Sequence, residues 1–352
     1  MKKTALNSAH KKLKAKMIVF HDWEMPISYS GIIEEHKAVR QKAGIFDVSH
    51  MGVIDITGIA ALNYLQYLTV NDVGKLKPND SQYTMMLNND GQVLDDMILT
   101  RFENYYRLVV NCSNFQKIIE WMKKNQSAKA FQAELKHRDD LSIIALQGPE
   151  SKSILMSICE FDSQIKSFTV TTGRINAVPV IVSHTGYTGE DGYEIFVDNG
   201  QAEMVWNLLL GKGAAPIGLG ARDTLRIEAG LPLYGQEIYN QITPFDIGYG
   251  WIVKLSKPEF VGKKYLESVP RRRRLYGVSL KDRVVPRQGC EVKDLGMVTS
   301  GTFSPTLNKS IALFLANRDL TDKDTAWLKI REKEYQGQVM NLPFIKKKGI
   351  NN

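Results

Sequence analysis

Residues 88–100 combine a turn signal with a mostly apolar run that two adjacent carboxylates interrupt. Residues 88–91, Asn-Asn-Asp-Gly, are typical of a turn. Residues 93–100 are apolar at both parities, which predicts a strand covered on both faces. Asp95 and Asp96 must point to opposite faces of that strand, so only one of them can face a given cavity. A carboxylate buried on either face needs hydrogen-bond donors or a cation. The sequence pattern alone does not show which of the two carboxylates faces a functional cavity.

Helical spacing and strand alternation recur along the rest of the chain. Apolar positions predict helices over residues 114–125, 201–210 and 221–229, and alternation predicts a strand over 193–197. From residue 275 onward, short β-rich segments are separated by Gly and Pro, which predicts a small all-β C-terminal domain. The chain as a whole therefore predicts a mixed α+β architecture.

Length and charge limit the number of domains and the kinds of partner that we expect. With 352 residues, the chain is long enough for two or three domains. Its formal net charge of +8 favours acidic partners. Part of this charge is a run of four arginines at 271–274, for which a solvated linker and a docking patch for an acidic protein both remain open. No nucleic-acid-binding motif accompanies the run, so we expect no nucleic-acid partner.

Other patterns argue against several classes of site. Cys112, Cys159 and Cys290 are widely spaced, which indicates neither disulfides nor a zinc site. The glycines near 211–220 do not complete a phosphate-binding loop. His50 and His184 have no second ligand at metal spacing, so we expect hydrogen-bonded structural histidines and no metal. No apolar run could span a bilayer, and residues 1–16 lack a secretory core, so we expect a cytoplasmic protein without membrane association.

Ordered motifs extend over essentially the whole chain. They are Trp23-Glu24-Met25-Pro26, Phe46-Asp47-Val48-Ser49-His50-Met51-Gly52, Gly186-Tyr187-Thr188-Gly189-Glu190-Asp191-Gly192-Tyr193-Glu194, Ala221-Arg222-Asp223-Thr224-Leu225-Arg226, and Leu231-Pro232-Leu233-Tyr234-Gly235. Together with the 88–100 segment, they make the chain resemble the T-protein family of the glycine cleavage system, the tetrahydrofolate-dependent aminomethyltransferases.

The resemblance implies a fold and an activity. The fold is an α+β, three-domain cloverleaf around a central folate channel. Its domains would be 1–54 plus 137–226 (folate-binding), 55–136 plus 227–274 (ferredoxin-like), and 275–352 (a small β-barrel). The activity is transfer of the methylene of an aminomethyl group from lipoyl-lysine on H protein to tetrahydrofolate, with release of ammonia. H protein would be the partner and tetrahydrofolate the co-substrate.

Asp96 matches the catalytic acidic residue of this family. Aminomethyl transfer passes through methylene-iminium character, which a fixed carboxylate in a low-dielectric cavity stabilises. The same group can accept a proton from a folate ring nitrogen. The alternative is that Asp96 only pairs with an arginine and holds two domains together.

Family positions also point to residues that bind folate. Glu194 lies opposite Tyr193 and Ile195 on its predicted strand, and its carboxylate can accept the two-donor edge of a pterin. Arg222 would contact folate or orient a carboxylate, whereas Arg226, on the same helix face, is equally compatible with a surface ion pair to Asp223 or Glu228. Further residues at family positions that line the folate site are Met51, Tyr83, Leu87, Val110, Asn111 and Tyr187. Trp251 belongs either to the core or to the channel rim.

The sequence departs from the family pattern at a few places, and two other functions remain open. Gln92 stands where a second glycine is common, and His21 and Asp22 stand where small residues are usual. A folate-dependent demethylase of a small methylated compound is the first alternative. A non-catalytic folate-binding assembly factor is the second, although the Cys-containing motif of such factors is absent from residues 231–237.

Overall fold

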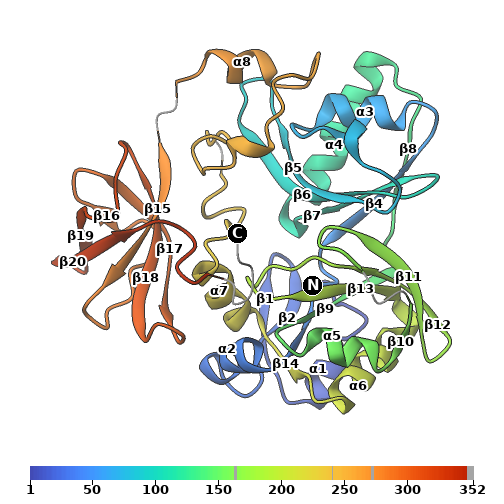
Figure 1. Cartoon of the computed structure of the whole chain (residues 1–352), viewed down its shortest axis with the longest axis horizontal. Helices are drawn as coiled ribbons and strands as arrows, with labels where there is room; N and C mark the ends of the chain where they lie inside the picture. Colours follow the sequence, from blue (N-terminus) through green and yellow to red (C-terminus); the bar gives the residue numbers. More distant parts are fainter. Residues whose placement is uncertain (162–164, 240, 271–272, 347–352) are drawn as a thin grey trace. The chain divides into compact units, whose positions relative to one another are not determined.

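The computed structural model describes residues 1–161, 165–239, 241–270 and 273–346 (Figure 1). The chain forms two compact units, and each is assembled from separate stretches of sequence. The first unit comprises Met1–Leu68, Asp72–Thr84 and Met97–Arg222; the second comprises Thr69–Asn71, Met85–Asp96 and Asp223–Asn352. The three-domain division, the cloverleaf and its channel stay predictions.

A seven-stranded sheet dominates the first unit. Its strands, in spatial order, are β10 (Cys159–Glu160), β11 (Val170–Ile175), β12 (Val178–Ser183), β13 (Gly192–Asp198), β9 (Leu141–Gln147), β3 (Gly44–Asp47) and β14 (Ala215–Pro216). Helices α5 (Ser151–Met156) and α6 (Ala202–Gly211) cover one face, where Leu155 and Trp206 join the same buried cluster as Ile195. Because side chains alternate along β13, Glu194 and Phe196 lie on the opposite face.

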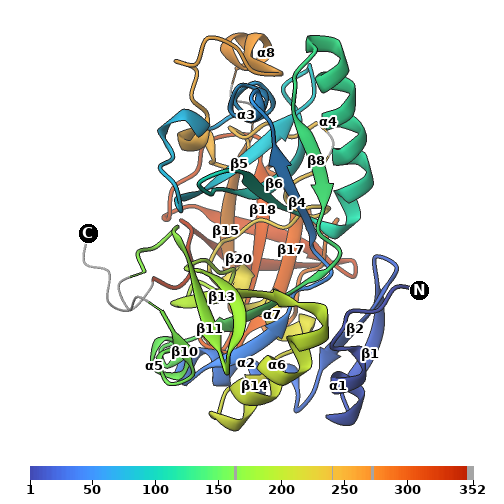
Figure 2. The same cartoon turned by 90° about the vertical axis from the view of Figure 1, so that its right-hand side faces the viewer.

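A five-stranded sheet carries the segment with the two carboxylates. Its order is β5 (Ser81–Leu87), β6 (Val93–Arg101), β7 (Tyr106–Val110), β4 (Gly52–Thr57) and β8 (Glu134–His137), accompanied by α3 (Ala61–Leu68) and α4 (Phe115–Lys129). Figure 2 shows α4 running alongside β8. The Tyr64 hydroxyl of α3 donates to the Met122 carbonyl oxygen of α4 at 2.6 Å. The predicted helix over 114–125 is confirmed, but it continues to Lys129, where Ala130 adopts a left-handed φ of 53°.

The second unit ends in a closed six-stranded barrel. The barrel order is β15 (Arg274–Leu280), β18 (Lys309–Ala316), β17 (Gly296–Ser304), β16 (Glu291–Val292), β19 (Thr325–Ile330) and β20 (Lys333–Met340). Val278, Phe314 and Leu328 fill its interior. The predicted all-β C-terminal domain and the mixed α+β class are confirmed. Arg271 and Arg272 of the arginine run lie outside the described residues.

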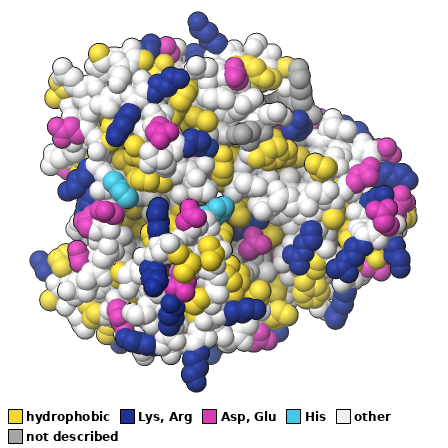
Figure 3. Space-filling model, turned by 180° about the vertical axis from the view of Figure 1, so that it is seen from behind, with side chains coloured by type: hydrophobic (Ala, Val, Ile, Leu, Met, Phe, Trp, Pro, Cys, Tyr) yellow, Lys and Arg dark blue, Asp and Glu magenta, His cyan; other side chains and the backbone are white. Residues whose placement is uncertain are grey.

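Shorter elements complete the chain: α1 (Asn7–Lys12), β1 (Lys16–Phe20), β2 (Trp23–Ser28), α2 (Ile32–Gln41), α7 (Leu219–Glu228) and α8 (Lys263–Ser268). No helix within the described ranges is long and apolar enough to cross a membrane. On the face drawn in Figure 3, lysine and arginine side chains are scattered among acidic ones. The three cysteines, all within the described part of the chain, are free thiols, as predicted.

The β1–β2 hairpin explains why small residues are usual before Trp23. Phe20 pairs with Trp23, so His21 and Asp22 form a two-residue turn with positive φ values of 44° and 69°. Two successive positive φ values favour Asn-Gly, because a side chain at each position is strained. This chain therefore holds two strained residues at the tip of the hairpin.

We expect the double substitution His21→Asn and Asp22→Gly to stabilise the protein by about 1 kcal/mol, because it relieves left-handed strain at the turn. The backbone hydrogen bond from Lys2 N to Asp22 O, 2.7 Å long, does not depend on either side chain. Urea unfolding of the variant and of the parent chain measures the difference. An unchanged or lower midpoint would show that the turn is not strained.

Candidate functional site

Strand β6 separates the two adjacent carboxylates as the alternation predicts. Val93, Asp95, Met97 and Leu99 are buried, with Asp95 at 0% exposure, whereas Asp96 on the other parity keeps accessible surface. Of these two residues, only Asp96 keeps accessible surface. Asp96 is the last residue of its stretch of the second unit.

The turn before β6 is fixed by one side chain. Asn88 Oδ1 accepts hydrogen bonds from the backbone N–H groups of Asp90 and Gln92 at 3.0 and 2.9 Å. Asn88 also donates from Nδ2 to Gln92 Oε1 at 3.0 Å, and Gly91 adopts a φ of 68°. Gln92, which departs from the family pattern, thus adds a side-chain hydrogen bond to the turn that leads into the strand of Asp96.

Glu194 lies on β13, paired with Ser183 of β12 and Ala145 of β9. The Thr185 hydroxyl donates to Glu194 Oε2. Burial raises the pKa of the Glu194 carboxyl, and the Thr185 hydrogen bond and the positive charge of Arg222 act in the opposite direction. Thr185 is the one hydrogen-bond donor to the Glu194 carboxylate among the described residues, and Oε1 accepts no hydrogen bond from them.

The glycine-rich turn before β13 is shaped by Gln147 of β9. A Cβ atom at Gly186 or Gly192 would overlap the Gln147 side chain, so a larger residue at either position would displace the Gln147 amide. Gln147 donates from Nε2 to the Thr185 carbonyl oxygen at 3.1 Å and accepts from the Thr188 hydroxyl at 2.9 Å. The buried Gln147 amide therefore holds both sides of the turn. Sequence reasoning missed this residue, because nothing local marks it.

Two further carboxylates stabilise this turn. Glu190 forms an ion pair with Arg40 at 2.8 Å. Asp191 Oδ1 lies 2.8 Å from His184 Nε2, and His184 Nδ1 lies 3.0 Å from the Ile165 carbonyl oxygen. The prediction that His184 is a hydrogen-bonded structural residue is confirmed.

Arg222 of α7 lies beside the glycine-rich turn. Its guanidinium carbon is 4.5 Å from the centroid of the Tyr187 ring, a cation–π contact. The Arg222 charge acts on Glu194, as described, and also on His50. Glu194, Arg222 and Tyr187 are thus brought together within the first unit.

His50 differs from its prediction. The side chain is only 3% exposed, yet its Nδ1 has no hydrogen-bond partner in the described part of the chain. Burial and, to a lesser degree, Arg222 lower the pKa of His50 to about 4. The expectation of a hydrogen-bonded histidine is wrong at this atom, and the ring is neutral at physiological pH.

The remaining residues that were predicted to line the folate site fall into an accessible group and a buried group. Met51, Tyr83 and Asn111 of the first unit retain accessible surface. Val110, paired with Gly52, and Leu87 of the second unit are completely buried, so their side chains contribute packing. Trp251 is 64% exposed, which excludes the core alternative for this residue.

Arg226 is structural. Its guanidinium bonds Asp223 Oδ1 at 2.8 Å, Glu237 Oε2 at 2.6 Å and the Ser300 hydroxyl at 2.6 Å, all within the second unit. Asp223 is thus a partner of Arg226, as the ion-pair alternative predicts. The Arg226 side chain is only 2% exposed, however, so the pair is not on the surface. Glu228, the other expected partner, accepts instead from Ser304 and Thr306.

We expect Arg226→Met to destabilise the protein by about 3–5 kcal/mol, because it leaves the buried Glu237 carboxylate without its cation. The free energy of unfolding in urea measures the loss. Asp223→Asn is the control: this carboxylate is 47% exposed, so its removal should cost less than about 1 kcal/mol. Equal effects of the two substitutions would contradict this assignment.

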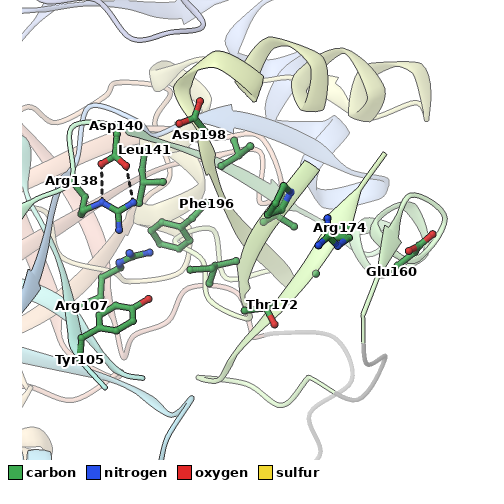
Figure 4. A pocket seen from close by; sticks show the side chains of 15 residues that line it. Tyr105, Arg107, Arg138, Asp140, Leu141, Glu160, Thr172, Arg174, Phe196 and Asp198 are labelled. Atoms are coloured by element: carbon green, nitrogen blue, oxygen red, sulfur yellow. Dashed lines mark hydrogen bonds and ion pairs between the residues drawn. The ribbon is translucent and has the colours of Figure 1, made fainter. Parts of the chain in front are cut away.

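A separate cavity of about 550 Å³ lies in the first unit (Figure 4). Arg138 bonds both Asp140, at 2.7 Å, and Asp55, at 2.8 Å, while Arg107 forms a bidentate pair with Asp55. Phe196 lines the cavity and lies under the Arg107 guanidinium. These two arginines and two aspartates therefore form a structural network, apart from the Glu194 cluster.

Comparison with known proteins identifies the family of the chain. The GCVT N-terminal domain family matches residues 6–257, and the glycine cleavage T-protein C-terminal barrel domain family matches residues 273–346. An aminomethyltransferase of Desulfitobacterium hafniense is 42% identical over 364 residues, with 99% of each chain covered. An aminomethyltransferase of Bacillus licheniformis is 42% identical over 363 residues, also with 99% of each covered.

A solved structure extends the likeness to three dimensions. The crystal structure of glycine cleavage system aminomethyltransferase T from Bartonella henselae matches with a TM-score of 0.92 and 32% identity, covering 98% of each chain. Sequence families, full-length relatives and fold therefore agree. The chain belongs to the glycine cleavage T-protein family and is an aminomethyltransferase of the glycine cleavage system.

Proposed function

We propose that the enzyme transfers the methylene of the aminomethyl group on lipoyl-H protein to tetrahydrofolate, with release of ammonia. The observation that carries the proposal is the Glu194 carboxylate, which has one bonded and one available oxygen beside Arg222 and Tyr187. A cytoplasmic location remains part of the proposal.

The residues around Glu194 fit a folate. A pterin presents an exocyclic amino group beside a ring N–H, and a carboxylate can accept both donors. Glu194 Oε1 is available for this role, while Thr185 occupies one lone pair of Oε2. The Arg222 guanidinium, stacked on Tyr187, supplies positive charge and a flat surface next to the carboxylate. Tetrahydrofolate, when bound, would supply the nitrogen atoms that take up the methylene group.

Asp96 is assigned the catalytic role. Its carboxylate stabilises positive charge that develops on the transferred methylene group, and it can accept a proton from a reacting nitrogen. Asp95 cannot act in this way, because it is completely buried on the opposite parity of β6. Met51, Tyr83, Leu87, Val110 and Asn111 stay predictions as the surrounding wall.

The H protein is assigned as partner from the family and from the charge of the chain. A net charge of +8 accelerates encounter with an acidic protein through long-range attraction. The proposal therefore treats the donor as a protein-bound aminomethyl group rather than a small methylated amine.

A donor comparison tests the proposal. The enzyme is supplied with aminomethyl-loaded H protein, with the aminomethyl adduct of free dihydrolipoamide, or with small N-methylated amino acids. Ammonia and methylenetetrahydrofolate are measured in each reaction, with and without tetrahydrofolate. We expect both products in equal amounts, dependent on tetrahydrofolate, and fastest with loaded H protein. Transfer of a methyl group from the small methylated amines to tetrahydrofolate, detected as methyltetrahydrofolate, together with no product from loaded H protein, would overturn the proposal.

A further inference from the structure

We infer that Thr185 is a positioning residue for the folate-binding carboxylate: a chain of two hydroxyl groups, Ser183 to Thr185, aims Glu194 at the pterin. This inference rests on the proposed function, because it assumes that Glu194 binds folate.

The chain is built from two buried hydroxyl groups and the partly buried Glu194 carboxylate. Ser183 Oγ lies 2.9 Å from Thr185 Oγ1, and Thr185 Oγ1 donates to Glu194 Oε2. Ser183 and Thr185 are 3% and 8% exposed, so water does not compete for these bonds. Ser183 and Glu194 are also register partners on β12 and β13, which keeps both ends of the chain on one face of the sheet.

The direction of the two bonds follows from the carboxylate. An ionised carboxylate can only accept, so the single hydroxyl proton of Thr185 goes to Glu194. Thr185 Oγ1 must then accept the proton of Ser183. Successive hydrogen bonds in one direction polarise each other and strengthen the bond to the charged end. The chain therefore stabilises the ionised form of Glu194.

The Thr185 hydroxyl is itself held in place from the backbone side. The Thr185 carbonyl oxygen accepts a hydrogen bond from Gln147 Nε2 at 3.1 Å. Gln147 is 1% exposed and packs against Gly186 and Gly192, so this anchor is rigid. Thr185 thus connects a fixed amide in the sheet with the carboxylate that faces the ligand.

The chemical consequence concerns the charge on Glu194. Burial raises the pKa of this carboxyl, and the hydrogen bond from Thr185 is the larger of the two opposing influences, ahead of Arg222. Arg222, on α7, is the charged side chain whose field acts on Glu194, while the paired neighbours Ser183 and Ala145 do not titrate. Removing the hydroxyl should raise the pKa further and favour a protonated carboxyl that cannot accept both pterin donors.

Equilibrium titration with tetrahydrofolate, followed by protein fluorescence from pH 5.5 to 8.5, tests the inference. We expect Thr185→Val to weaken binding roughly 10- to 100-fold, the usual size for a hydrogen bond to a charged group. The loss should grow as the pH falls, because Glu194 is protonated at a higher pH than in the parent chain. Thr185→Ser should restore both affinity and pH profile, and Ser183→Ala should give a smaller shift in the same direction.

Three controls separate the possible outcomes. Thr171→Val removes a hydroxyl that bonds only a neighbouring carbonyl oxygen, and it should change nothing. Failure of the parent chain to bind tetrahydrofolate would overturn the proposed function itself. Binding that Glu194→Gln abolishes but Thr185→Val leaves unchanged would overturn the inference alone. A uniform loss at every pH that Thr185→Ser does not rescue would also overturn it, because that is the signature of a merely structural residue.

Discussion

Asp96→Asn is expected to lower turnover by about 10²- to 10⁴-fold, the usual contribution of a positioned acid–base group. Asparagine keeps the size of the side chain, but it replaces one acceptor oxygen by an NH2 donor and removes the negative charge. The charge that develops on the methylene group then loses its fixed counter-charge. Tetrahydrofolate affinity should change only a few-fold, because pterin recognition is assigned to Glu194.

Asp95→Asn provides the matched control for this prediction. The two residues are neighbours on β6, but Asp95 is 0% exposed on the other parity. We expect Asp95→Asn to lower the stability of the folded chain by about 1–3 kcal/mol, because a buried charged group loses its bonding pattern. Single-turnover ammonia release from loaded H protein should stay near normal in the folded fraction. The catalytic assignment of Asp96 fails if both variants lose turnover equally.

Glu194→Gln is expected to weaken tetrahydrofolate binding by about 10²- to 10³-fold. Two charge-assisted hydrogen bonds to the pterin are replaced by one neutral hydrogen bond, and the glutamine NH2 group faces the second pterin donor. The rate at saturating tetrahydrofolate should fall far less. Binding to the parent chain should weaken as the pH falls, because burial raises the pKa of Glu194 and protonation removes an acceptor. The glutamine variant should lose that part of the pH dependence, since it cannot titrate.

Glu190→Gln tests whether the effect belongs to Glu194. Glu190 lies in the same glycine-rich turn but pairs with Arg40 at 2.8 Å. Its substitution should leave the tetrahydrofolate dissociation constant within a few-fold of the parent value. Equal losses in the two variants would show that any disturbance of the turn abolishes binding.

Local patterns predicted the elements that carry these residues. Alternation along β6 predicted that Asp95 and Asp96 point to opposite faces, because side chains on a strand alternate regardless of tertiary context. Which of the two faces is buried could not be predicted from alternation. The same argument placed Glu194 opposite Tyr193 and Ile195. Assignment of Asp96 and Glu194 to chemistry and binding came from the family resemblance, since alternation reports faces and not ligands.

Long-range partners could not be predicted in this way. Gln147 precedes the turn it supports by some forty residues, and only the β9–β13 register brings the two together. A surface ion pair was one of two open alternatives for Arg226, yet its side chain is buried against Glu237 and Ser300. His50 Nδ1, expected to be hydrogen-bonded, has no partner within the described residues, and no sequence signal indicates this.

Binding is assigned to Glu194 and chemistry to Asp96, and one paired measurement tests this division of roles. The tetrahydrofolate dissociation constant and the single-turnover rate at saturating tetrahydrofolate are determined for Asp96→Asn and Glu194→Gln with the same loaded H protein. We expect Asp96→Asn to be slow, with near-normal affinity for tetrahydrofolate. We expect Glu194→Gln to bind tetrahydrofolate weakly and to keep most of its rate. The reverse pattern, or equal loss of both quantities in both variants, would contradict this division of roles.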